Sequence, residues 1–280
     1  MSPPPPGDVG HVYVVDLPTV GSSVRFAFLE HDGPIAFAHR GGASDGLENS
    51  LAAFARAVDL GFRYLETDVH ATADGVLLAF HDSTLDRVTD RVGRVVELPW
   101  TTVRAARIGG REPIPRLEDV LGTWPDVRVN VDVKHASAIG PLVEVVRRTG
   151  ALDRVCVASF SERRLSAVRR QLGPGLCTSL GPRGVALLRA AATHDRAALL
   201  AGRGAAAIPC AQVPDRLGPL RVVTRGLVRL AHRRGQRVHV WTVDDPAEMH
   251  RLLDLGVDGL MTDRPETLRT VFEDRGLWGR

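Results

Sequence analysis

The chain has 280 residues, of which 44% are hydrophobic and 25% are charged, and its formal net charge at pH 7 is +3. Such a chain can bury its own core, and its small charge without blocks of like sign gives no reason to expect a nucleic-acid partner. No run of about 18 apolar residues predicts a membrane span, and the proline-rich start does not resemble a signal peptide, so we expect a cytoplasmic protein.

The three cysteines, Cys156, Cys177 and Cys210, are widely spaced and each falls in an expected core strand. An odd number of cysteines at such spacing argues against a disulfide framework and favours a reducing environment.

Residues 1–33 are expected to be an N-terminal extension that packs on the main domain, residues 34–280. The prolines of Pro3–Pro6 are followed by two short apolar patches, Val12–Val15 and Phe26–Leu29, separated by turn residues. Nothing in this composition assigns a function to the extension.

From Ile35 onward, short apolar runs alternate with stretches rich in Ala, Leu and Arg that have helical periodicity. The expected strands are Ile35–Ala38, Tyr64–Val69, Val127–Val133, Val155–Ser159, Leu176–Leu180, Ala206–Cys210, Val238–Val243 and Gly259–Thr262. The expected helices include Ser50–Leu60, Leu142–Arg148, Glu162–Gln171, Arg225–Arg234 and Ala247–Leu255, and several end at a glycine. Eight such units predict an α/β fold, a (β/α)₈ TIM barrel.

Val76–Phe80 is a further apolar run, and it follows the second strand after a turn at Asp74-Gly75 that is too short for a parallel crossover. We therefore expect a returning hairpin strand that carries His81 back toward the second strand. Residues 83–115 would then be an inserted segment after the second barrel strand, over the barrel mouth. Long insertions of this kind often act as lids.

Glu66 and Asp68 are two positions apart in a strand, so their side chains share one face with Cα atoms roughly 6.6 Å apart. Asp132 and Lys134 repeat this spacing on another strand. A solvated strand face would also carry carboxylates, but here the neighbours are apolar and unpaired buried carboxylates are costly. An all-oxygen set suits one divalent cation, Mg²⁺ or Ca²⁺, with Mn²⁺ as a further candidate.

His39 ends the first strand and His81 ends the hairpin strand, so the two imidazoles could act as general acid and general base on a phosphate between them. A single histidine is more often a core residue, but this pair brackets the Glu-x-Asp motif. Arg40 could clamp a phosphate oxygen, and Gly41-Gly42 could either bring backbone amides to the anion or simply form a tight turn.

Lys134 is the one lysine among 36 basic residues, the other 35 being arginine, which favours a chemical need for a compact charge beside a phosphate or metal. Glu48 and Asn49 precede a helix and can support the site, with helix capping as the alternative. Trp241 could line the pocket or pack in the core. Asp263, after the last strand, is expected to be a loop or capping residue.

Together, these motifs resemble the glycerophosphodiester phosphodiesterase family over Pro34–Leu268. The matching segments are His39-Arg40-Gly41, Glu48-Asn49, Glu66-Thr67-Asp68, Asp74-Gly75, His81-Asp82, Val131–Lys134, Val240–Val243 and Asp258–Asp263. The resemblance implies a TIM barrel that hydrolyses glycerophosphodiesters to glycerol 3-phosphate and an alcohol.

The resemblance also implies roles for single residues. His39 and His81 match the acid/base pair, Glu66 and Asp68 match metal ligands, and Lys134 matches the lysine beside the phosphate; Arg40 and Trp241 match substrate-pocket positions. Three positions depart from the family pattern: Leu47 in place of proline, Ser50 in place of threonine, and Asp132, the expected third ligand, in place of glutamate.

Two other readings stay open at this point. A lysophospholipase D-type activity would use the same chemistry on lipids with one acyl chain, with peripheral lipid contact at the mouth. A catalytically silent barrel that binds phosphodiesters is the other, although each expected position carries a competent residue. In all three cases the partner is a small-molecule phosphodiester, and the oligomeric state is open.

Overall fold

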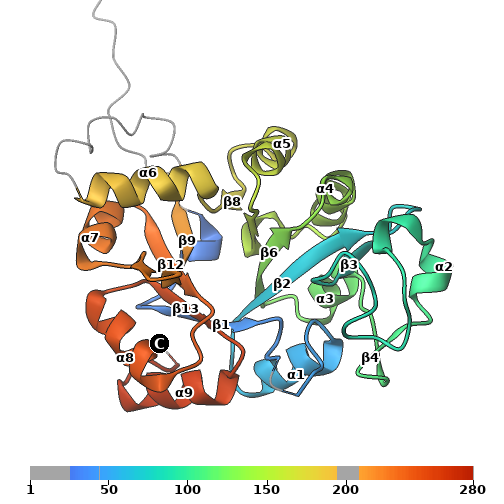
Figure 1. Ribbon diagram of the computed structural model, residues 1–280, viewed down its shortest axis with the longest axis horizontal. Coiled ribbons are helices and arrows are strands. Elements are labelled where there is room, and N and C mark those ends of the chain that lie inside the picture. The colour runs from blue at the N-terminus through green and yellow to red at the C-terminus, as the bar shows by residue number, and fades with distance from the viewer. Residues whose placement is uncertain (1–25, 44, 194–207, 280) are drawn as a thin grey trace, which may run out of the picture.

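The computed structural model describes residues 26–43, 45–193 and 208–279, and it shows a parallel barrel surrounded by helices (Figure 1). The barrel strands are β1 (Ile35–His39), β2 (Tyr64–Ala71), β6 (Arg128–Val133), β7 (Val155–Ala158), β8 (Cys177–Thr178), β9 (Cys210–Pro214), β12 (Arg237–Trp241) and β13 (Gly259–Thr262). They are hydrogen-bonded in the order β8-β7-β6-β2-β1-β13-β12-β9. A parallel bridge between Ser179 and Cys210 joins the two ends, so the predicted (β/α)₈ TIM barrel is confirmed.

One predicted strand is displaced in the structure. The sequence placed the sixth strand at Ala206–Cys210, but β9 begins at Cys210 and runs to Pro214. Ala206 and Ala207 lie outside the described residues. The prediction followed the apolar run, whereas backbone pairing with β12 selects a segment that contains Gln212 and ends in proline.

The predicted hairpin strand is confirmed. β3 (Leu77–Ala79) pairs antiparallel with β2, with Val69 opposite Ala79 and Ala71 opposite Leu77. This pairing carries the chain back from the end of β2 to the level of Asp68, whose carbonyl accepts a hydrogen bond of 2.8 Å from the N–H of Phe80, and His81 is the next residue.

The inserted segment after β3 contains η2 (Val95–Glu97), α2 (Trp100–Val103), β4 (Arg107–Ile108) and β5 (Glu112–Pro113). It has its own apolar cluster, which includes Phe80, Leu85 and Ile108, and in Figure 1 it lies beside β3. Because this small core holds the segment together, its polar side chains can be presented to the barrel in a fixed position.

The main helices are α1 (Leu51–Asp59), α3 (Leu117–Thr123), α4 (Ile139–Arg148), α5 (Glu162–Leu172), α6 (Pro182–Thr193), α7 (Arg225–Arg233), α8 (Pro246–Leu255) and α9 (Pro265–Asp274). The five helices predicted from the sequence are α1, α4, α5, α7 and α8. Short elements complete the fold: η3 (Ala136–Ala138), η4 (Leu152–Arg154), β10 (Arg216–Leu217) and β11 (Leu220–Arg221). α6 follows β8, and residues 194–207, which come after it, lie outside the described part.

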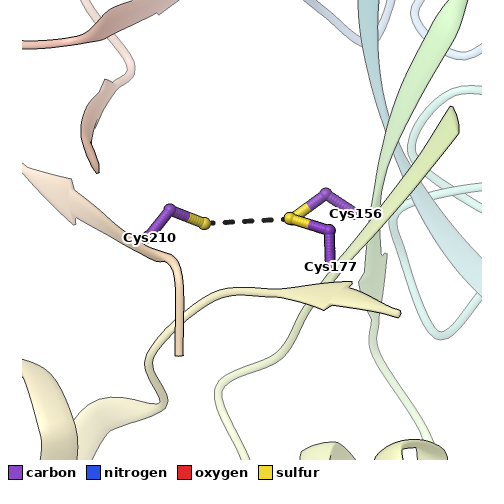
Figure 2. Close-up of side chains that lie close together, drawn as sticks. All are labelled: Cys156, Cys177 and Cys210. Atoms are coloured by element: carbon purple, nitrogen blue, oxygen red, sulfur yellow. Dashed lines mark hydrogen bonds between the residues drawn. The ribbon is translucent and has the colours of Figure 1, made fainter. Parts of the chain in front are cut away.

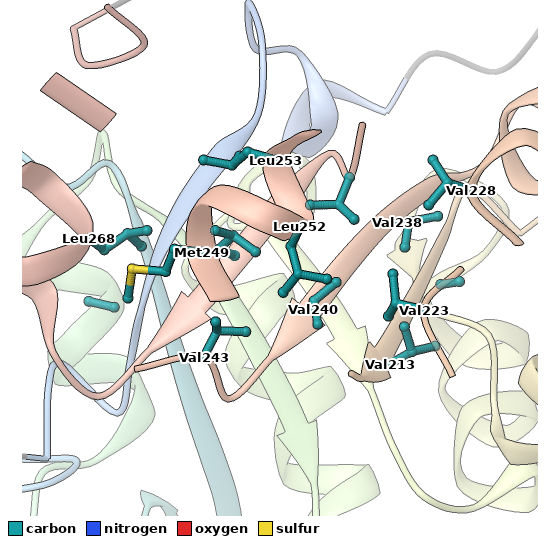
Figure 3. Packing of buried hydrophobic residues seen from close by; sticks show 14 of the residues in the cluster. Val213, Val223, Val228, Val238, Val240, Val243, Met249, Leu252, Leu253 and Leu268 are labelled. Atoms are coloured by element: carbon teal, nitrogen blue, oxygen red, sulfur yellow. The ribbon is translucent and has the colours of Figure 1, made fainter. Parts of the chain in front are cut away.

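Alternation along the strands separates the core from the site. In β12, Val238 and Val240 point outward and pack against helices, as Figure 3 shows with Leu252 of α8. His239 and Trp241 of the same strand therefore point into the barrel. Because side chains alternate along the strand, the apolar residues are buried between the strands and the helices, and the other residues point into the barrel interior.

The segment before β1 closes one end of the barrel. Phe28 of η1 (Ala27–Leu29) is buried against Phe37 and Tyr64, and the Tyr64 hydroxyl donates a hydrogen bond of 3.0 Å to the Phe28 carbonyl. Among the described residues, no helix is long and apolar enough to span a membrane.

Candidate active site

Most of the residues singled out in the sequence surround one cavity of about 860 Å³. Its lining includes His39, Arg40, Glu66, Asp68, His81, Asp132, Lys134 and Trp241. The strand register explains this convergence: His39 is opposite Glu66 in β1 and β2, and Asp68 is opposite Asp132 in β2 and β6. In a parallel barrel, the carboxyl ends of the strands share one mouth.

His39 is held between two carboxylates. Its Nδ1 lies 2.6 Å from Oδ1 of Asp263, and its Nε2 lies 3.6 Å from Oε2 of Glu66. Burial lowers the pKa of His39, but these two carboxylates outweigh that effect, and the net result is a raised pKa. The imidazole therefore has a fixed orientation and an increased affinity for a proton.

Asp263 lies in the loop between β13 and α9, as expected, but the sequence did not indicate its contact with His39. The capping alternative is wrong, because the cap position of α9 is Arg264, which makes no side-chain capping bond. Asp263 instead pairs with His39, and its backbone N–H donates to Oδ1 of Asp244 at 2.8 Å. Its position one residue after a barrel strand, like that of Arg40 after β1, was the signal available in the sequence.

His81 has a carboxylate partner of its own. Its Nδ1 lies 2.5 Å from Oδ1 of the adjacent Asp82, whose other oxygen accepts a bond of 2.6 Å from Nε of Arg87. Burial raises the pKa of Asp82, but the hydrogen bonds from Arg87 and His81 lower it to about 2. Asp82 is therefore an ionised carboxylate over the whole neutral range, and it orients His81.

Arg87 links the inserted segment to the site, and sequence reasoning missed it. Its guanidinium donates two bonds to Glu48, of 3.0 and 2.7 Å, besides its bond to Asp82. Burial raises the pKa of Glu48, but Arg87 and Arg40 outweigh that effect and lower it. The contact spans 39 positions, so no local pattern indicated it.

Arg40 and Asn49 form the loop at the end of β1, and both have positive φ angles, 52° and 59°. Arg40 donates from Nη1 to Glu48 at 2.9 Å, and its Nε lies 3.0 Å from Oδ2 of Asp68. Asn49 donates to the same carboxylate oxygen at 3.3 Å and accepts a bond of 2.7 Å from Thr67. Glu48 and Asn49 thus lie behind the cavity and position the residues that line it.

The two glycines after Arg40 serve close packing. A Cβ on Gly41 would lie 2.8 Å from the backbone N of Phe54 in α1, and a Cβ on Gly42 would lie 2.8 Å from the Pro265 ring in α9. This favours the tight-turn reading of the pair, because only glycine lets the loop approach both helices.

Lys134 sits between two carboxylates. Its Nζ lies 2.8 Å from Oδ1 of Asp68 and 2.7 Å from Oδ2 of Asp132. Burial lowers the pKa of Lys134 and the two carboxylates raise it, with a net increase. For Asp68, Lys134 and Arg40 outweigh the burial that raises its pKa, so that carboxyl has a lowered pKa.

The carboxylates are suited to a divalent cation by their chemistry. Burial and the neighbouring Asp68 raise the pKa of Glu66 to about 7, and burial raises the pKa of Asp132. The Oδ1 atom of Asp132 is buried and accepts no hydrogen bond from the described residues. Excess negative charge and an unpartnered oxygen favour a cation with oxygen ligands. Among the described residues, ligand oxygens of these three carboxylates do not gather within 4.8 Å of one another, and Lys134 contacts two of the carboxylates.

Trp241 and Phe160 form an aromatic part of the cavity wall. Their rings meet edge to face at 5.6 Å, and Nζ of Lys134 lies 5.7 Å from the centre of the Phe160 ring. Trp241 therefore lines the cavity, and it also packs against the buried cluster that contains Phe37 and Met261. Phe160, which sequence reasoning missed, directly follows Ser159 at the end of an expected strand.

The comparisons with known proteins agree with this geometry. Residues 39–267 match the model of the glycerophosphoryl diester phosphodiesterase family. A Mycobacterium tuberculosis protein named "Probable glycerophosphodiester phosphodiesterase 2" is 46% identical over 260 residues, which are 92% of this chain and 98% of that protein. A glycerophosphodiester phosphodiesterase of Caldanaerobacter subterraneus is 30% identical over 263 residues, 86% of this chain and 99% of that one.

Solved structures give the same result. A crystal structure of a glycerophosphoryl diester phosphodiesterase, described as putative, from Silicibacter pomeroyi superposes with a TM-score of 0.74 at 27% identity. The match covers 90% of this chain and 99% of that one. With the barrel, the carboxylate-paired histidines and a family match over most of its length, the chain belongs to the glycerophosphoryl diester phosphodiesterase family.

Proposed function

We propose that this protein is a metal-dependent phosphodiesterase that hydrolyses glycerophosphodiesters to glycerol 3-phosphate and an alcohol. The observation that supports this most strongly is the convergence of His39, His81 and Lys134 on one cavity, each oriented by a carboxylate. Its family membership points to the same activity. A silent phosphodiester-binding barrel is disfavoured because every position expected to be catalytic carries a competent side chain.

The two histidines carry the proton transfers in this proposal. One imidazole removes the proton from the glycerol hydroxyl next to the phosphate, and that oxygen attacks phosphorus. The bond from phosphorus to the alcohol breaks, and the other imidazole donates a proton to the departing oxygen. Water then opens the cyclic phosphate to give glycerol 3-phosphate, with the two histidines in reversed roles.

Two cations of the chain stabilise the charge on the phosphoryl oxygens. Lys134 presents a compact ammonium, held in place by Asp68 and Asp132. Arg40 presents a guanidinium on the other side of Asp68. Because both are already paired and oriented before substrate binds, little reorganisation is needed as negative charge develops.

Glu66, Asp68 and Asp132 would hold one divalent cation, Mg²⁺ or Ca²⁺, with Mn²⁺ as a further candidate. The unpartnered Oδ1 of Asp132 and the raised pKa of Glu66 support this assignment. When bound, such an ion supplies a Lewis acid that polarises the phosphodiester.

A second candidate function, hydrolysis of lysophospholipids, is favoured by the apolar wall of the cavity. Phe160, Leu217 and Leu220 line it and are more than half exposed, and Val185 of α6 and Val222 lie beside them. Exposed apolar side chains at a cavity mouth are suited to an acyl chain or to peripheral contact with lipid.

A substrate panel separates the two activities. Glycerophosphocholine, glycerophosphoethanolamine and lysophosphatidylcholine would be assayed with Mg²⁺, Ca²⁺ and Mn²⁺ in turn, for the wild type and for the double variant Leu217→Asp/Leu220→Asp. If the enzyme hydrolyses lysophospholipids, the double variant loses turnover of lysophosphatidylcholine and keeps its turnover of glycerophosphocholine. A glycerophosphodiesterase favours the water-soluble substrates in both proteins.

Three broader assignments belong to the same proposal. Residues 34–280 would form one catalytic domain with an insertion at about 83–115, and residues 1–33 would form an extension that packs on it. The protein would act in the cytoplasm, on small-molecule phosphodiesters. Residues 1–25 lie outside the described part.

A further inference from the structure

Three cysteines meet inside the barrel, away from the residues assigned to catalysis. Cys156, Cys177 and Cys210 come from β7, β8 and β9, which are neighbours at the closure of the barrel. Figure 2 shows their sulfur atoms directed toward one another. The Sγ atoms of Cys156 and Cys210 are 3.9 Å apart, and all three sulfurs lie within 4.8 Å of one another. We call these three residues the trithiol cluster.

The trithiol cluster is shielded from water. Each of its residues is at most 1% exposed, and the cluster packs with apolar side chains that include Phe28, Phe37 and Met261. All three thiols are free. Cys210 also lies 3.7 Å from the carbonyl oxygen of Thr178. Ordinary core packing would accept isolated cysteines, but it gives no reason for three sulfurs to converge on one point.

The three thiols differ in their pKa values because of their hydrogen bonds to one another. Burial raises the pKa values of Cys156 and Cys177, whereas hydrogen bonds from these two thiols lower the pKa of Cys210. Two basic side chains, His239 and Arg169, lower it further. Arg169 is fixed by hydrogen bonds to the Thr178 hydroxyl, at 2.8 Å, and to the carbonyl of Ser179.

His239 is an independent sign that a group is expected here. It lies on β12, the strand next to β9, and it is completely buried. Neither ring nitrogen has a hydrogen-bond partner among the described residues. An imidazole with two unsatisfied nitrogens in an apolar core is costly, and a nearby anionic metal–thiolate centre would stabilise its charged form.

We propose that the trithiol cluster binds one soft metal ion of filled d shell, Cu(I) or Zn(II), through the sulfurs of Cys156, Cys177 and Cys210. With metal–sulfur bonds of about 2.3 Å, three sulfurs around one ion are separated by roughly 4 Å, which matches the spacing in the structure. Soft thiolate ligands select such ions over Mg²⁺ or Ca²⁺. Each thiol that becomes a ligand gives up its proton, and the Arg169 guanidinium offsets part of the resulting negative charge.

The side chain of Gln212 lies between the cluster and the catalytic cavity. Gln212 lines that cavity, and its Nε2 lies 4.0 Å from the sulfur of Cys156 and 2.8 Å from Oδ1 of Asn130. Rotation of this side chain would open a path for an ion from the cavity floor to the sulfurs. The site therefore lies below the candidate active site and is chemically distinct from its carboxylates.

The test is a titration of the purified, reduced, metal-free protein with Cu(I) under anaerobic conditions and, separately, with Cd²⁺ as the spectroscopic probe for the zinc arm. In at least one of the two titrations, we expect an ultraviolet thiolate-to-metal charge-transfer band that saturates at one equivalent of metal. We also expect the bound metal to raise the melting temperature of the protein. The chain has three cysteines in all, so any thiolate band reports on this cluster.

Two variants make the test specific. Glu66→Gln/Asp68→Asn removes carboxylates of the candidate active site and is expected to leave the band unchanged, while Cys210→Ser is expected to abolish one-equivalent binding. A wild-type protein that develops no such band with either ion overturns the proposal, whatever the variants do. A folded Cys210→Ser variant that keeps the full band also overturns it.

Discussion

Asp263 Oδ1 lies 2.6 Å from Nδ1 of His39, although the two residues are 224 positions apart. The contact exists because the last barrel strand, β13, pairs with the first, β1, and so brings the two loops together. Asp82 makes the corresponding contact with His81, through Nδ1 of that imidazole. Each candidate catalytic imidazole thus has its Nδ1 held by a carboxylate, and the Nε2 of His39 lies 3.6 Å from Glu66.

Asp263→Asn is expected to lower the turnover of glycerophosphocholine by about 10- to 100-fold, the range seen when a group that orients a functional histidine is lost. The amide keeps the size of the side chain but removes the charge that holds the imidazole. Steady-state kinetics measure the effect, with Asp274→Asn, at the end of α9, as the matched control. Turnover equal to the wild type would show that Asp263 does not position His39.

His39→Ala and His81→Ala are each expected to reduce turnover by at least about 100-fold, the usual scale for a general acid or base. His250→Ala, which contacts Arg275 away from the cavity, is the control and should keep its activity. If either variant of the pair retains near-normal turnover, that histidine takes no part in proton transfer.

Lys134→Ala is expected to reduce turnover by about 100-fold or more, because a preorganised charge facing the phosphate would be lost. Lys134→Arg should recover only part of this, since a planar guanidinium does not fit between Asp68 and Asp132 as an ammonium does. Arg94→Lys, an exchange in an exposed ion pair, serves as the control. Wild-type turnover in Lys134→Arg would contradict the need for a compact charge.

Burial raises the pKa of Tyr64 from 10.0 to about 12, and Arg128 offsets only part of this. The pKa of Tyr64 is higher in the folded state than in the unfolded state. Its contribution to the free energy of unfolding, about 2.7 kcal/mol at most, is therefore present below pH 10 and is lost as the pH rises to about 12. Urea unfolding at pH 8 and pH 11 measures the loss, which should shrink in Tyr64→Phe and persist in Tyr13→Phe. An equal loss in both variants would contradict this assignment.

Much of the fold and site could be predicted because the informative residues follow apolar runs. His39, Asp132 and Lys134 lie at or next to the ends of their strands, and parallel strands bring such ends to one mouth. Glu66 and Asp68 lie within β2, where the register places them opposite His39 and Asp132. Strand spacing alone placed Glu66 and Asp68 on a common face.

The rest depends on contacts between distant segments. Arg87 reaches Glu48 across 39 positions, and Asp263 reaches His39 only through closure of the barrel. The start of β9 was misplaced because the alanine-rich run before it is as apolar as a strand, while the true strand includes Gln212. In the same way, the cysteines looked like separate core residues until the barrel brought their sulfurs together.

The most direct test of the proposed activity is the release of glycerol 3-phosphate from glycerophosphocholine by the purified protein, measured with and without a chelator. Release should stop in the chelator, and Mg²⁺, Ca²⁺ or Mn²⁺ should restore it in the wild type but not in Glu66→Gln/Asp68→Asn. Undiminished release in the chelator, or full restoration in that variant, would contradict a cation held by these carboxylates. Failure to release glycerol 3-phosphate with any of the three ions would contradict the activity itself.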